Sequence, residues 1–179
     1  MVSMSRIRII ALFLFVSTSA PAAAQSTEEA LRDDLLLHFE QLASKATQLS
    51  EAFPSELYAW SPGEGVMTAG HVLAHISRYN YLYLSENLGV GTPDGIDLER
   101  MEEVRDKEHV VGMLTTSVDH ARRSISGLSA AELSSDTRLY GRDVKGWAAL
   151  VQLVSHLGEH VGQLVAYSRM NDIVPPWSS

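Results

Sequence analysis

The stretch HLGEHVGQLVAYSRMN, residues 156–171, has apolar side chains at helical spacing and two histidines that are four residues apart. Residues i and i+4 lie on one face of an α-helix about one turn apart, so the imidazoles of His156 and His160 can bind one metal ion. At about 100° per residue, Gln163 and Tyr167 fall on the same stripe of the helix. The stripe therefore predicts a metal site with an amide and a phenol close to its imidazoles.

A third imidazole is expected from the stretch TAGHVLAHISRYN, residues 68–80, which also reads as a helix. His75 lies in an apolar setting that predicts an inward orientation, and His71 lies one turn earlier on the same face. Three histidines from two helices would bind a metal and leave one or more coordination positions open. Histidines on an apolar face are also often core residues with a satisfied hydrogen bond, and that alternative stays open. The remaining histidines have no second histidine four residues away and are predicted to be surface or packing residues: His38, His109 and His120.

The letters HLGEH also match the H-x-x-E-H pattern of inverted zinc proteases, in which Glu159 would be the general base. That pattern needs a further carboxylate ligand well downstream, and Asp172 is the sole acid after His160. A protease is therefore disfavoured. Glu159 lies at the edge of the histidine stripe, about 60° from His156. It could accept a hydrogen bond from a ligand histidine or from bound water, or it could simply be solvated.

The first 24 residues have the pattern of a secretory signal peptide. Arg6 and Arg8 precede a short apolar run, Ile9–Val16, and an A-x-A pattern ends at Ala24. The run is too short for a typical membrane-spanning helix. We therefore expect a periplasmic or secreted protein with no stable membrane insertion after cleavage. An uncleaved membrane anchor is the alternative.

The mature chain would span residues 25–179, or 179 − 24 = 155 residues, which suits a single domain. It has no cysteine, so disulfides, a thiolate nucleophile and cysteine-containing zinc sites are excluded, and histidine must hold any soft or borderline metal. The formal net charge of −8 becomes −10 once Arg6 and Arg8 are removed. A chain this acidic repels phosphate backbones, so no nucleic-acid partner is expected.

Helical periodicity dominates the mature chain, and no convincing strand pattern appears. Four long helices are predicted, at about Thr27–Phe53, Ala69–Leu88, Lys107–Ile125 and Gly146–Asn171, with a minor turn at Ala130–Leu133. The apolar face of the last helix is predicted to comprise Trp147, Leu150, Val151, Val154, Leu157, Val161, Leu164 and Val165. The fold class is therefore all-α, an up-down four-helix bundle with a long connection between the second and third helices.

Two segments resemble the DinB/YfiT-like superfamily of metal-binding four-helix bundles. The segment YAWSPGEGVMTAGHVLAHISRYN, residues 58–80, is similar to the family's W-x-P loop and the L-x-H-I helix that follows it. The segment HLGEHVGQLVAYSRMNDIVPPWS, residues 156–178, is similar to its H-x-x-x-H-x-G-Q helix and R-x-N-G-I-V-P-P tail. Asp172 stands where the family usually has glycine, a mild departure because aspartate tolerates a left-handed turn.

The resemblance implies a metal site in which His75, His156 and His160 bind one divalent ion. Zinc or nickel is the family's common metal. Iron and copper also suit imidazole ligands, and manganese is a further alternative. Some relatives are thiol-dependent transferases or isomerases, which implies an unknown small-molecule substrate, such as a low-molecular-weight thiol, and a homodimer is also plausible. Glu159, Gln163 and Tyr167 are candidates for contacts to a ligand histidine or to substrate.

Two functions remain open from the sequence. In the first, the protein is a metal-dependent S-transferase or hydrolase whose open metal site activates a small thiol or water. In the second, it is a non-catalytic metal-binding module, in which the ion clamps two helices or a dimer and His71 serves as an extra ligand.

Overall fold

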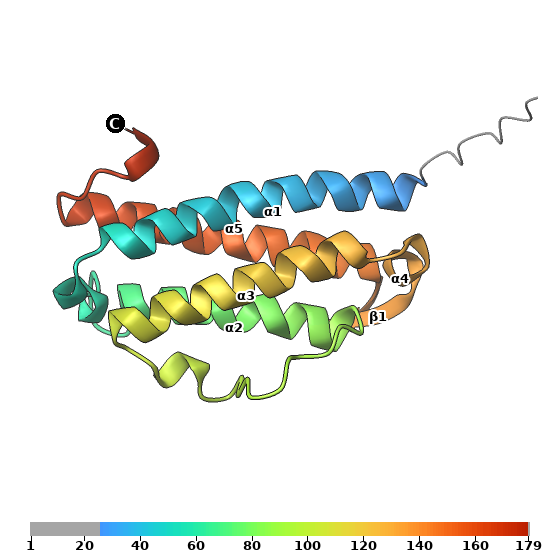
Figure 1. Cartoon of the computed structure of the whole chain (residues 1–179), viewed down its shortest axis with the longest axis horizontal. Coiled ribbons are helices and arrows are strands. Elements are labelled where there is room, and N and C mark those ends of the chain that lie inside the picture. Colours follow the sequence, from blue (N-terminus) through green and yellow to red (C-terminus); the bar gives the residue numbers. More distant parts are fainter. Residues whose placement is uncertain (1–25, 179) are drawn as a thin grey trace, which may run out of the picture.

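The computed structural model describes residues 26–178, and the predicted signal peptide lies outside this range. Helices dominate it, as expected, and a single hairpin of two strands is added (Figure 1). The α-helices are α1 (Thr27–Ala52), α2 (Ala69–Asn87), α3 (Lys107–Gly127), α4 (Ala130–Ser134) and α5 (Gly146–Met170). Short 3₁₀ helices are η1 (Ser55–Ala59), η2 (Met101–Glu103) and η3 (Pro176–Ser178), and the strands are β1 (Asp136–Leu139) and β2 (Arg142–Lys145).

Side-chain caps explain where the first three long helices begin. Ser26 and Glu29 form a reciprocal capping box at the start of α1. Thr68 accepts a hydrogen bond from the His71 amide at the start of α2, and Asp106 does the same for the His109 amide at α3. These caps satisfy amides that have no partner inside the helix.

The four long helices form the predicted bundle, with α1 and α5 running in one direction and α2 and α3 in the other (Figure 1). Cross-helix contacts agree with these directions. The side-chain amide of Asn80 donates to the Ser117 hydroxyl at 3.1 Å, and the rings of Tyr81 and His120 lie 5.0 Å apart in a tilted arrangement. The later residue of α2 thus contacts the later residue of α3. Residues 88–106 form a long connection along the bundle, so the chain returns to the end at which α2 begins before α3 starts. Helices α2 and α5 consequently lie antiparallel, which brings their histidines to one level.

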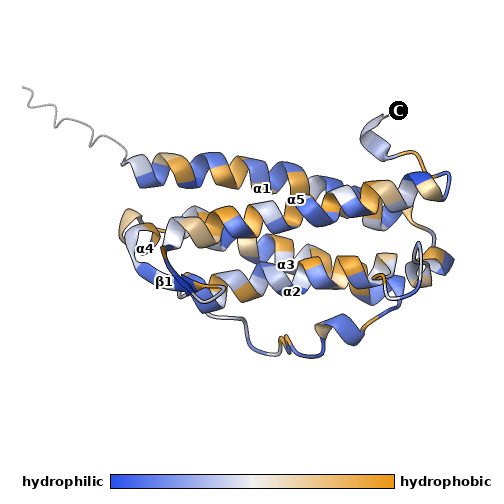
Figure 2. Ribbon diagram, turned by 180° about the vertical axis from the view of Figure 1, so that it is seen from behind, coloured by the Kyte–Doolittle hydropathy of each residue, from blue (hydrophilic) through white to orange (hydrophobic). Residues whose placement is uncertain are grey.

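Buried apolar side chains from the four long helices form the core of the bundle. Hydrophobic and hydrophilic residues alternate along the ribbon of each long helix (Figure 2). On α5 the predicted apolar face is too wide, because Trp147 and Val151 are 41% and 39% exposed. Val151 projects about 120° from Leu157, beyond the part of the helix that α1 and α2 cover. Leu153, on the other side of Leu157, is buried instead.

The expectation that no strand forms is wrong for residues 136–145, where β1 and β2 pair as an antiparallel hairpin. Each strand has only four residues, so an alternation of apolar and polar side chains cannot be told apart from the neighbouring turn residues. Tyr140 and Gly141 connect them with φ values of 50° and 79°, the left-handed pair of a tight hairpin turn. The hairpin follows α4 and precedes α5 in the sequence, and it packs against α2 and α5.

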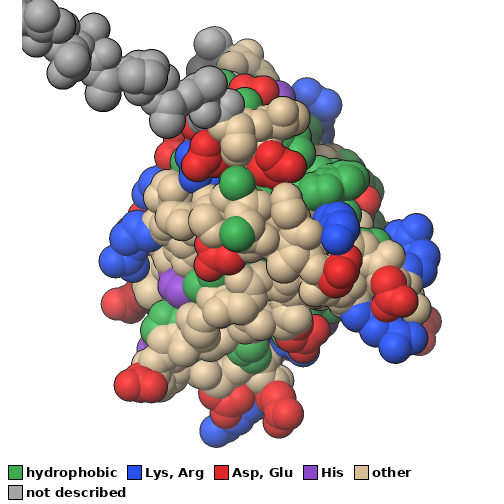
Figure 3. All heavy atoms as spheres, turned by 90° about the vertical axis from the view of Figure 1, so that its right-hand side faces the viewer, with side chains coloured by type: hydrophobic (Ala, Val, Ile, Leu, Met, Phe, Trp, Pro, Cys, Tyr) green, Lys and Arg blue, Asp and Glu red, His purple; other side chains and the backbone are tan. Residues whose placement is uncertain are grey.

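The surface of the bundle at the hairpin end carries acidic and basic side chains intermixed (Figure 3). Within residues 26–178, no helix combines the length and the apolar character that crossing a bilayer requires.

Candidate metal centre

Three histidine side chains meet between α2 and α5. The Nε2 atom of His156 lies 3.2 Å from Nε2 of His75 and 3.2 Å from Nε2 of His160. The three potential ligand atoms all lie within 4.8 Å of one another. His156 and His160 are one turn apart on α5, and the antiparallel α2 brings His75 to face them. The structure therefore brings together the three residues that the sequence predicted as ligands.

A chain of hydrogen bonds orients His160. The Tyr167 hydroxyl donates to the Met67 carbonyl at 3.0 Å, because that carbonyl can only accept. The same hydroxyl accepts from Nε2 of Gln163 at 2.7 Å, which turns the amide oxygen of Gln163 toward Nδ1 of His160 at 2.9 Å. Nδ1 of His160 must therefore carry the proton, and its Nε2 presents a lone pair to the centre. Gln163 and Tyr167 thus lie where the helical stripe placed them.

A carboxylate orients His75 in the same way. Glu102, in η2, accepts from Nδ1 of His75 at 2.9 Å through Oε1 and contacts Nε2 of His71 at 3.0 Å through Oε2. Arg78 approaches Oε1 at 3.4 Å. Sequence reasoning missed Glu102, because it lies in an aperiodic connection 27 residues after His75 and no spacing rule connects the two.

The electrostatics of the site favour neutral imidazoles. Burial, followed by the neighbouring His160 and His75, lowers the pKa of His156 to about 3. Burial also lowers the pKa of His75, although Glu102 opposes this effect. Burial alone would raise the pKa of Glu102, but hydrogen bonds from His71 and His75 hold that pKa below its ordinary value. Neutral imidazole beside an ionised carboxylate is the form that binds metal.

The three imidazoles fit a divalent ion. Metal–nitrogen bonds of about 2.0–2.1 Å in a tetrahedral arrangement place ligand nitrogens about 3.3 Å apart. The two 3.2 Å separations around His156 are close to this value. Three imidazole nitrogens that face one place form a donor set that suits zinc, nickel or another borderline metal.

Aromatic rings cover one side of the centre. Tyr79 stacks on His156 with a centroid distance of 4.4 Å and lies 4.3 Å from the His75 ring. Tyr83 meets the edge of His156 at 5.6 Å, and its hydroxyl bonds that of Tyr140 in the hairpin turn. Burial first, then the Tyr140 contact, raises the pKa of Tyr83. These two aromatic rings therefore cover one side of the imidazoles.

The other residues considered from the sequence lie outside the group of three. His71 is turned toward Glu102, and Glu159 is exposed on α5 and forms no hydrogen bond with the three histidines. His38 and His109 are exposed, and His120 is half-buried against Tyr81. The surface or packing roles expected for these three histidines agree with their positions.

Solved structures of similar fold come from several proteins. A DinB-like protein from Bacillus cereus has a TM-score of 0.69 and 16% identity over 80% of this chain and 95% of its own. YfiT from Bacillus subtilis, described as a probable metal-dependent hydrolase with an unusual four-helix bundle topology, has a TM-score of 0.64 and 16% identity over 87% and 94%. A mycothiol-dependent maleylpyruvate isomerase has a TM-score of 0.59 and 17% identity over 78% and 63%.

A comparison with curated proteins found no match. The family model of the DinB superfamily matches residues 38–164, which include the three clustered histidines and Glu102. The resemblance seen in the two sequence motifs is thereby confirmed. Because the match covers most of the chain, the protein belongs to the DinB superfamily.

Proposed function

We propose that this protein is a metal-dependent hydrolase that binds one divalent ion through Nε2 of His75, His156 and His160. The observation that carries the proposal is the convergence of three imidazoles without a fourth ligand from residues 26–178. A site with three protein ligands leaves a position for a reacting molecule, as in catalytic zinc sites. A structural zinc site would close that position with a fourth side chain.

The position of His71 favours the catalytic alternative over a structural clamp. Of the histidines outside the group, His71 is the nearest in sequence to one of its members. Its Nε2 nevertheless contacts Glu102 at 3.0 Å. Glu102 therefore keeps this imidazole away from the other three. His75 has a side-chain exposure of 16%, and His160 is half-buried, so solvent reaches one side of the group.

A divalent ion at this position would act as a Lewis acid and lower the pKa of a water or thiol that it binds. The residues of the chain supply the surroundings for this chemistry. Glu102 and Gln163 hold the Nδ1 protons of His75 and His160 and thereby keep their Nε2 lone pairs available. Tyr79 and Tyr83 exclude water from the opposite side.

A thiol-dependent S-transferase is the second candidate. One observation favours it, the fold shared with the mycothiol-dependent maleylpyruvate isomerase. In that case a low-molecular-weight thiol, rather than water, would be the activated nucleophile. The pattern of residues 1–24 supports a further proposal, that the protein acts in the periplasm or outside the cell. These compartments are oxidising, whereas the cytosol keeps thiols reduced. This location favours the hydrolase.

Metal stoichiometry and turnover together test the proposal. Protein stripped with a chelator is reloaded with Zn²⁺ or Ni²⁺, measured by elemental analysis, and assayed against ester and amide panels with and without a small thiol. We expect one ion per chain, metal-dependent hydrolysis, and loss of both in His160→Ala. The matched control His109→Ala removes an exposed histidine and should keep both.

Other outcomes separate the alternatives. Turnover that requires the thiol would replace the hydrolase with the transferase. A bound ion without any turnover, in a protein that unfolds on chelation, would support the structural module. Failure of the wild-type protein to bind either ion would overturn the metal site itself.

A further inference from the structure

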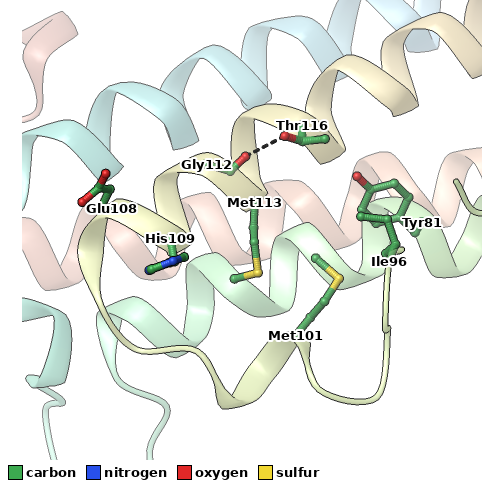
Figure 4. A pocket seen from close by; sticks show the side chains of 8 residues that line it. All are labelled: Tyr81, Ile96, Met101, Glu108, His109, Gly112, Met113 and Thr116. Atoms are coloured by element: carbon green, nitrogen blue, oxygen red, sulfur yellow. Dashed lines mark hydrogen bonds between the residues drawn. The ribbon is translucent and has the colours of Figure 1, made fainter. Parts of the chain in front are cut away.

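The connection between α2 and α3 is held against the bundle from two sides at η2. Met101 is only 6% exposed and points toward Met113 of α3, in a groove of about 500 Å³ that Tyr81 and Ile96 also line (Figure 4). Glu102, the next residue, points instead toward α2, where it contacts His71 and His75. Adjacent residues of one short turn thus anchor the connection to two different helices.

Arg78 adds a second attachment between α2 and the connection. Its Nε atom donates to the Leu98 carbonyl at 2.8 Å, and its Nη1 atom lies 3.4 Å from Oε1 of Glu102. One arginine on α2 therefore fixes both the backbone of the connection and the carboxylate at its end. Because both oxygens of Glu102 are engaged by side chains of α2, the carboxylate has little freedom to rotate.

The contact between Glu102 and His75 links docking of the 88–106 connection to the tautomer of His75. When the connection is docked, the carboxylate accepts the Nδ1 proton of His75, so Nε2 of His75 faces the other two histidines without a proton. When the connection is undocked, the ring of His75 loses the partner that sets its tautomer and its orientation. Docking and readiness to bind metal therefore depend on the same hydrogen bond.

We propose that Glu102 is a positioning residue that couples docking of the 88–106 connection to metal binding at His75. The inference rests on the proposed metal site. An ion that binds better when the connection is docked must, by linkage, stabilise the docked connection to the same extent. The carboxylate acts through His75 and needs no contact with the ion.

Zn²⁺ affinity, measured by competition with a chromophoric chelator, tests the positioning role. We expect Glu102→Ala to weaken binding about 10–100-fold, the usual effect of removing the partner of a ligand histidine. Glu102→Gln keeps an acceptor oxygen and should lose less affinity. Glu103→Ala is the matched control, because Glu103 is the exposed neighbour that contacts Arg100, and removing it changes the charge equally. Equal affinity in Glu102→Ala and Glu103→Ala would overturn the proposal.

A second readout does not depend on a bound ion. Nitrogen-15 spectra of the metal-free protein should show His75 protonated at Nδ1, and Glu102→Ala should lose this preference while Glu103→Ala keeps it. If wild-type protein binds no Zn²⁺, the metal site and the coupling both fail. If the wild-type protein binds Zn²⁺ but the tautomer of His75 is the same in Glu102→Ala, only the positioning role fails.

Hydrogen exchange tests the reverse direction of the coupling. Zn²⁺ should slow amide exchange over residues 93–106 of the wild-type protein, although none of them is a proposed ligand. His160→Ala removes a ligand on α5, far from the connection in sequence, and should abolish this effect. Unchanged exchange in the wild-type protein on adding saturating Zn²⁺ would overturn the coupling.

Discussion

The side-chain oxygen of Gln163 lies 2.9 Å from Nδ1 of His160, three residues earlier on α5. The orientation of that amide follows from the Met67 carbonyl, which compels the Tyr167 hydroxyl to donate and hence to accept from Gln163. A backbone carbonyl before α2 therefore determines the tautomer of a histidine on α5. Removing any member of this series of hydrogen bonds should weaken metal binding without removing a ligand.

Gln163→Leu should weaken Zn²⁺ binding about tenfold, because His160 loses the acceptor that holds its Nδ1 proton. Gln163→Glu keeps an acceptor at the same place and should bind more tightly than Gln163→Leu. Competition titrations measure both. Gln41→Leu, at an exposed position of α1, is the control and should match the wild-type protein. If Gln163→Leu bound Zn²⁺ with wild-type affinity, the hydrogen bonds to His160 would have no role in metal binding.

The stability of the metal-free protein should fall as the pH drops from about 6.5 toward 3. The pKa of His156 is lowered from 6.5 to about 3 in the folded state, chiefly by burial. In this window the unfolded chain binds a proton that the folded chain does not, so acidification favours unfolding. Above pH 6.5 neither state is protonated and this contribution is constant. His75 acts in the same direction because its pKa is also lowered.

Urea denaturation at about pH 7.5 and about pH 5 measures this dependence. His156→Gln removes the titrating ring and should flatten the dependence. His38→Gln, at an exposed position, should keep the wild-type slope. An equal slope in wild-type and His156→Gln protein would show that other groups cause the acid sensitivity.

The bundle and its histidine group were accessible from the sequence because both depend on helical periodicity. His156 and His160 share a face of one helix whatever that helix packs against. The convergence of His75 on them requires in addition that the two helices face each other with these histidines at one level. The same periodicity overstated the apolar face of α5, since it gives the direction of Trp147 and Val151 but not how far the neighbouring helices extend over them.

The remaining features depend on contacts that no local pattern encodes. Glu102 reaches His75 because the connection folds back along the bundle, and its sequence, GTPDGIDLERMEE, has no period. The hairpin depends on Tyr140 taking a left-handed conformation, which is uncommon for a residue with a side chain. The shared direction of α2 and α3 arises from the path of the connection, which its length permits but does not require.

Gly146→Ala should destabilise the protein by about 1–3 kcal/mol. Gly146 begins α5 directly after the hairpin, and a Cβ atom there would lie 2.5 Å from the Glu132 carbonyl oxygen and 3.2 Å from Leu88. The α4 backbone would have to move. Gly112→Ala is the opposite case, because no atom other than those of the adjoining residues and backbone of α3 lies within 4 Å of the added Cβ. Thermal melts should show a gain of about 0.5–1 kcal/mol for that control. A neutral Gly146→Ala would contradict the close approach of α4 and α5.

Ser117→Ala should destabilise the protein by about 1–3 kcal/mol, because it leaves the buried amide of Asn80 without its partner. Asn80 and Ser117 are 2% and 0% exposed, and their 3.1 Å bond joins α2 to α3. Ser126 is a matched control. Its hydroxyl bonds the carbonyl three residues earlier, as that of Ser117 does, but it is exposed and accepts nothing from α2. Ser126→Ala should therefore change stability by less than about 0.5 kcal/mol in urea denaturation. Equal effects of the two substitutions would show that the Asn80–Ser117 bond does not help to align α2 beside α3. In that case the double variant Asn80→Ala/Ser117→Ala would show no coupling energy between the two side chains.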